Sequence, residues 1–288
     1  MGTSQSSGGP GSGVSMVPSW TPEPPAGDAP DAGAPGNEAE GGDAPADDSS
    51  AAPQAPPPAA VPLAPRARFL GVRRALGDFA RSGDGRDMRR SLGHYVRTGY
   101  GGSSTATRRF GGTATTAGAL GGALARVATG EPAEPGSPLD PALLAGRDAQ
   151  EIMDAVVEAV RPVDGTQDAE AERAAIRDAL TELLTRFPDA DLLNLDPEQR
   201  SFAIERFTAI DVFRRFELDV GKTIVEKAPS AVTALSRLKE VREYVKQSVA
   251  ASFRKLRAAG RTLTSGRISQ VVRDALRETF DVFEGYAE

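Results

Sequence analysis

The first 65 residues constrain the fold most, because they supply too little apolar side-chain area to build a core. They contain 14 prolines and 10 glycines, a composition typical of segments that do not pack into a globular domain. Eight acidic residues lie in this stretch, and no basic residue precedes Arg66. We therefore predict a long disordered arm over residues 1–65, in which a Pro/Ala/Asp-rich linker follows residues 1–20. The folded body must begin near residue 66.

From that point onward, apolar residues recur at the spacing of helices. Ile176, Leu180 and Leu183 form one such stripe, which a proline ends at position 188. The run Asp196-Pro197-Glu198-Gln199 is a typical helix start, with an Asp cap and Pro in the first turn. No stretch alternates in the manner of a strand. The fold class predicted is mainly α, a helical bundle preceded by the arm.

Two helical parts are expected within the body. Residues 66–130 form an Arg/Gly-rich helical segment, and residues 139–288 form an α-helical domain. In the first part, Ala114, Gly118 and Gly122 recur every four residues and predict a ridge of small side chains that lets another backbone approach closely.

Few residues are suited to catalysis or metal binding. The chain has no cysteine and one histidine, His94, which excludes disulfides, thiolate sites and any site that needs two imidazoles. Gly221-Lys222-Thr223 matches the end of a phosphate-binding loop, but Phe216 stands where that motif requires glycine. We predict that the protein is not an enzyme and has neither a metal site nor a cofactor.

Charge is divided along the chain. Residues 66–130 hold 12 arginines, no lysine and three aspartates, whereas every charged side chain in residues 1–65 is acidic. Arginine forks suit phosphates and aromatic rings suit bases. The candidate docking residues for nucleic acid or a partner protein are Arg97, Arg108, Arg109 and Phe110.

The first twenty residues resemble a recognition segment. Removal of Met1 leaves Gly2 with an unhindered α-amine, part of which is neutral near pH 7. Trp20 is the only tryptophan, and an amphipathic ring beside prolines is a typical anchor for a partner protein. A disordered start with an incidental tryptophan is the alternative. The predicted modification site is Gly2, and the predicted partner-binding residues are Thr3, Ser4, Val17, Pro18 and Trp20.

Two stretches of sequence are similar to a known family. The start MGTS, a Ser/Gly/Pro run and VPSW, together with HYVRTGYGG and TRRFGGTATTAGAL between His94 and Leu120, resemble the QatB family of the Qat anti-phage system. The resemblance implies a bacterial, cytoplasmic component of a four-protein defence operon. Its implied partners are an ATPase, a QueC-like enzyme related to 7-cyano-7-deazaguanine synthase, and a TatD-like nuclease.

Three functions are compatible with these features. The first is a non-enzymatic adaptor whose N-terminus the QueC-like partner recognises and modifies at Gly2 with a deazaguanine. The second is a nucleic-acid-binding subunit that uses the arginine-rich residues 66–126. The third is an N-myristoylated adaptor, because Met1–Ser6 matches M-G-x-x-x-[ST], although a second, basic anchoring signal is absent before Arg66. With no signal peptide and no membrane span expected, the predicted location is the cytoplasm.

Overall fold

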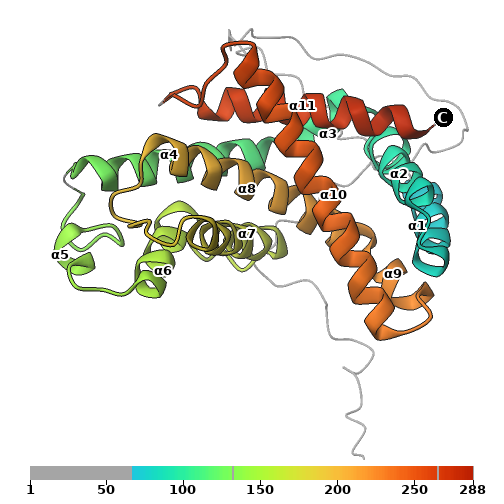
Figure 1. Cartoon of the computed structure of the whole chain (residues 1–288), viewed down its shortest axis with the longest axis horizontal. Helices are drawn as coiled ribbons and strands as arrows, with labels where there is room; N and C mark the ends of the chain where they lie inside the picture. Colours follow the sequence, from blue (N-terminus) through green and yellow to red (C-terminus); the bar gives the residue numbers. More distant parts are fainter. Residues whose placement is uncertain (1–66, 132, 265, 288) are drawn as a thin grey trace, which may run out of the picture. The chain divides into compact units, whose positions relative to one another are not determined.

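A computed structural model describes residues 67–131, 133–264 and 266–287. All regular secondary structure in these ranges is helical (Figure 1), which confirms the predicted mainly α fold. The predicted arm, with Gly2, Val17 and Trp20, lies outside the described residues.

The body begins with helices built from the arginine-rich segment. Helix α1 covers Leu70–Ser82, and α2 covers Gly85–His94. A π-helical turn, η1, follows over Tyr95–Gly99. A break at Phe110 separates α3, Ser103–Arg109, from α4, Gly111–Thr129.

The next helices start at caps visible in the sequence. After the short α5, Pro141–Leu144, come α6, Ala149–Val160, and α7, Gln167–Arg186. Asp148 caps α6 in a reciprocal capping box with Glu151. Asp196 does the same with Gln199 for α8, Pro197–Phe216, as the start signal there predicted.

A second π-helical turn, η2, over Glu217–Gly221, continues α8 directly into α9, Lys222–Lys227. The long helix α10 covers Ala231–Ala258, and α11 covers Ile268–Glu284. The short 3₁₀ turn η3, Gly285–Ala287, contacts α2. Helix α10 packs against both α8 and α11, and each of these two helices also packs against α4 (Figure 1).

Helix α8 is the buried centre of the body. Phe207, Phe213 and Phe216 are buried, whereas Phe202 is half-buried. One hydrophobic cluster joins residues of α1–α4 to residues of α6–α11, so the helices before and after residues 131–138 share a core.

Close approach of α4 to α11 depends on glycine. A Cβ atom at Gly118 would lie 2.2 Å from Ser269 Oγ, and one at Gly121 would lie 2.3 Å from Ile268 Cδ1. Gly122, the predicted third member of the ridge, would meet nothing within 4 Å. The prediction of a small-residue ridge is therefore right for Gly118 and wrong for Gly122, because contact follows the i, i+3 row to Gly121.

Candidate functional site

The predicted arginine docking residues lie on the surface. Arg97 is in η1, and Arg108 and Arg109 are the last two residues of α3. All three side chains are exposed. None is within ion-pair distance of a carboxylate in the described ranges, whereas Arg81, for example, is paired with Asp78 at 2.7 Å. These guanidinium groups are free to meet an external anion.

The prediction that Phe110 is a docking residue is wrong. Phe110 is fully buried, with its ring 5.6 Å from Tyr100 and 5.0 Å from Phe280 between centroids. Phe69 and Tyr95 are buried in the same aromatic group. Because the core covers these rings, Phe110 has no free face for a base or a partner side chain.

The two π-helical turns meet at a shared hydrogen-bond cluster. Tyr95, at the start of η1, donates its hydroxyl to Asp219 Oδ2 at 2.9 Å, and Tyr100 donates to the same oxygen at 2.8 Å. Burial raises the pKa of Tyr100 to about 12 and that of Tyr95 well above its usual value. Both hydroxyls therefore remain protonated donors. Extra-residue turns of this kind occur often at functional sites.

Beside this cluster lies a polar cleft with a volume of about 300 Å³. Arg215 closes one side, where it donates to Asp168 Oδ2 at 3.3 Å and to the Arg109 carbonyl at 3.5 Å. Burial disfavours the charge on Arg215, but Asp168, Asp211 and the two tyrosines, Tyr100 and Tyr95, together outweigh this effect and raise its pKa. The residues that line the polar cleft are Arg68, Tyr100, Arg109, Asp168, Arg215, Leu218 and Asp219.

A buried carboxylate lies behind this wall. Asp211 of α8 is 2% exposed and accepts a hydrogen bond of 2.6 Å from the Thr113 hydroxyl of α4. Burial raises its pKa to about 6, although the Thr113 bond acts in the opposite direction. Nearby Glu172 adds to the rise, and Arg215 reduces it. Ionisation of the Asp211 carboxyl therefore lowers the stability of the folded state relative to the unfolded state.

Asp211→Asn should therefore stabilise the protein near neutral pH. Raising the pKa from 3.8 to about 6 costs about 3 kcal/mol once both states are ionised. Below pH 6 the folded carboxyl takes up a proton that the unfolded chain does not, so the variant's advantage should shrink, to about half by pH 5. Urea unfolding of both proteins at pH 8 and pH 5 measures this difference in the free energy of unfolding. Asp189→Asn, at an exposed turn, should change little, and an Asp211→Asn advantage independent of pH would contradict the assignment.

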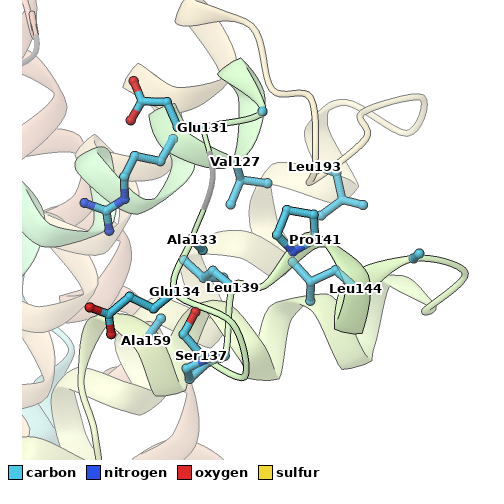
Figure 2. A pocket seen from close by; sticks show the side chains of 14 residues that line it. Val127, Glu131, Ala133, Glu134, Ser137, Leu139, Pro141, Leu144, Ala159 and Leu193 are labelled. Carbon is cyan, nitrogen blue, oxygen red and sulfur yellow. The ribbon is translucent and has the colours of Figure 1, made fainter.

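A larger, mainly apolar cavity opens where α4 connects to α5. Its volume is about 610 Å³. In Figure 2, Pro141, Leu144 and Leu193 gather on one side, and the carboxylates of Glu131 and Glu134 lie on the other. The size and lining are those of a typical site for an apolar ligand or side chain.

Other motifs from the sequence are located as follows. His94 is half-buried at the end of α2, and burial, with Arg90 and Arg97, lowers its pKa. Gly221-Lys222-Thr223 lies in continuous helix across η2 and α9, where it forms no phosphate-binding loop. In the described part of the chain, no three His, Asp or Glu residues are grouped to hold a metal ion. Within the same ranges, no helix has the length and hydropathy needed to cross a bilayer.

Sequence reasoning missed the Tyr95–Tyr100–Asp219 cluster and the buried Asp211. The only local signal was the spacing of five residues between the two tyrosines, which a π-helical turn brings together. The Gly2, Thr3, Ser4, Val17, Pro18 and Trp20 predictions lie outside the described residues.

Comparison with protein-family models identifies a family for this chain. A family model described as "QatB: Qat anti-phage system associated protein QatB" matches residues 101–283, more than half of the chain. The match runs from the turn before α3 almost to the end of α11. It includes Arg215 and Asp219 but not Tyr95 or Tyr100. No curated protein and no solved structure matches.

Proposed function

Because the chain belongs to the QatB family, and is thus a component of the Qat anti-phage system, we propose that it is the adaptor that presents an N-terminal segment to partner proteins of that system. The observation that carries the proposal is family membership combined with the composition of residues 1–65. That segment joins a small-residue tip to a single tryptophan and then to a long acidic, proline-rich linker.

The proposed partner is the QueC-like enzyme of the same operon. Such an enzyme activates a deazaguanine carboxylate with ATP and then admits ammonia. In the proposed reaction, the α-amine of Gly2 replaces ammonia. It forms an amide C–N bond with the activated carboxyl carbon, the ATP-derived leaving group departs, and the amine proton passes to solvent. The residues proposed to hold the segment in place are Thr3, Ser4, Val17, Pro18 and Trp20.

Residues 1–20 are long enough for Gly2 to react inside the cleft while Trp20 binds outside it. Small side chains at Thr3 and Ser4 let the tip enter a cleft shaped for ammonia. Trp20 follows far enough along that it can bind outside the cleft, since an extended chain covers up to about 3.3–3.6 Å per residue. The ATPase and the TatD-like nuclease are the other proposed partners, and the cytoplasm is the proposed location.

Peptide mass spectrometry tests the proposal. The protein is produced with and without its QueC-like neighbour, and the N-terminal peptide is isolated from each sample. We expect an added deazaguanine on Gly2 only when the neighbour is present. Unmodified Gly2, or retained Met1, in both samples would contradict the acceptor reaction.

A second candidate function is nucleic-acid binding. It is favoured by the exposed guanidinium groups of Arg97, Arg108 and Arg109, which have no ion-pair partner in the described ranges. The buried Phe110 contributes nothing to it. Binding would then depend on phosphate contacts and not on base stacking.

This second candidate predicts a steep salt dependence. Replacing Arg97, Arg108 and Arg109 with alanine should weaken DNA or RNA binding, and the slope of log K against log salt should fall by about one for each phosphate that the variant no longer neutralises. Deleting residues 1–65 should tighten binding, because it removes eight acidic residues. Fluorescence anisotropy across a salt series measures both effects.

The matched control replaces three exposed arginines that are already ion-paired, Arg147, Arg177 and Arg261. It removes the same charge but no free guanidinium group. Equal weakening in both triple variants would show a diffuse charge effect, and no binding by the truncated protein at low salt would rule the candidate out.

A further inference from the structure

The polar cleft presents two guanidinium groups that no carboxylate of the described residues neutralises. Arg68 and Arg109 both line it. The third arginine there, Arg215, is already paired with Asp168 at 3.3 Å. The unpaired positive charge in the cleft is therefore that of Arg68 and Arg109, which are 41 positions apart in the sequence.

Arg68 is held in place by aromatic rings. Its guanidinium carbon lies 4.5 Å from the centre of the Phe69 ring and 5.9 Å from that of Tyr100. A guanidinium stacked in this way retains its hydrogen-bond donors while losing much of its rotational freedom. An anion that binds Arg68 therefore meets a donor that is already oriented.

The cleft also contains a hydrogen-bond acceptor, the carboxylate of Asp219. Asp219 Oδ2 takes both tyrosine hydroxyls, whereas its second oxygen, Oδ1, accepts none from the described residues. Leu218, next to it on η2, is 53% exposed and adds an apolar surface to the cleft. The lining thus combines guanidinium groups suited to an anion, a carboxylate oxygen suited to a hydroxyl donor, and an apolar patch.

We propose that the polar cleft binds a nucleoside monophosphate. The phosphate lies between Arg68 and Arg109, a ribose hydroxyl donates to Asp219, and the base rests on Leu218. A volume of about 300 Å³ lies at the small end of the range for ligand sites, which fits one nucleotide. This inference goes beyond the adaptor function and does not depend on it.

The two tyrosines take no direct part in this recognition, because both hydroxyls are already donated to Asp219. Their role is to position that carboxylate. Tyr100 stays protonated because burial raises its pKa to about 12. Oδ2 of Asp219 therefore continues to accept the tyrosine hydroxyls, and Oδ1 is left to accept a hydrogen bond from the ligand.

Isothermal titration calorimetry on the full chain tests the proposal, with adenosine 5′-monophosphate as the probe and with inorganic phosphate and adenosine as separate arms. We expect the monophosphate to bind at least about tenfold more tightly than either fragment, because the arginines contact its phosphate while Asp219 and Leu218 contact its nucleoside. Arg109→Gln should weaken its binding by about tenfold, since a charge-assisted hydrogen bond is removed.

Arg254→Gln is the matched control, because Arg254 is exposed on α10 and does not line the cleft. Its affinity should equal that of the unchanged protein. Arg68→Gln should weaken binding as Arg109→Gln does, and thermal unfolding shows whether either variant alters the fold.

Four results would overturn the proposal. Adenosine binding as tightly as the monophosphate would show that the phosphate is not recognised. Inorganic phosphate binding as tightly would remove the assigned roles of Asp219 and Leu218. Equal weakening in Arg254→Gln and Arg109→Gln would show general charge attraction, and absence of binding by any probe would show that the cleft is not a nucleotide site.

Discussion

Gly2→Pro is expected to abolish deazaguanine addition and anti-phage activity while the helical body keeps its stability. Proline turns the primary α-amine into a ring amine that is secondary and hindered, and it fixes the backbone at the point that is proposed to enter the partner's cleft. Residue 2 precedes every helix of the described body by more than sixty positions, so circular dichroism and thermal unfolding should not change. Peptide mass spectrometry and a phage plating assay measure the two losses.

Gly2→Ala separates chemistry from recognition. It retains a primary amine and adds one methyl group, so modification should persist at a reduced rate. Trp20→Ala should weaken binding to the QueC-like partner without changing the residue that is modified. Full modification of Gly2→Pro would contradict the acceptor role, whereas a protein that defends against phage without any modification would reduce the segment to a docking element.

Phe110→Ala is expected to lower the free energy of unfolding by about 3–5 kcal/mol, the cost typical of emptying a fully buried phenylalanine site. The ring is 0% exposed and packs between Tyr100 of the η1 end and Phe280 of α11. Arg215 also lies over it, 5.1 Å from the ring centre. Urea unfolding followed by circular dichroism measures the change.

Arg108→Ala and Arg109→Ala are the controls for this prediction. Both are exposed neighbours of Phe110, and surface substitutions usually change stability by no more than about 0.5 kcal/mol. The bond from Arg215 to the Arg109 carbonyl involves only the backbone of Arg109, so alanine preserves it. A Phe110→Ala variant as stable as these two would contradict the buried placement of the ring.

Helix boundaries were predictable from sequence where a side chain marks them. Asp196 forms the cap that its sequence context indicated, and α8 begins at the next residue. The break at Phe110 had no such marker, because neither proline nor a cap residue stands there. It arises because the buried ring holds the chain between α3 and α4, which is a tertiary effect.

The candidate site was less predictable, because its members are far apart along the chain. Tyr95 and Asp219 are separated by 124 positions, and nothing local to either indicates the other. The same limit explains Phe110: aromatic residues among arginines are typical both of a nucleic-acid surface and of a core edge, and only packing distinguishes them. Arginine exposure followed directly from side-chain polarity.

The pairing of the first described helices with the last has a consequence for synthesis on the ribosome. Helix α1 packs against α9, α2 against η3, and α3 against α11. At about 5–20 residues per second, roughly 7 to 30 seconds pass between the emergence of α1 and that of α9. During that interval Val72, Leu76 and Phe79, all fully buried in the finished protein, have α2 beside them but lack the surface that α9 supplies. A nascent chain of this kind is a natural client for ribosome-associated chaperones, and slowing its translation would extend the period in which it needs them.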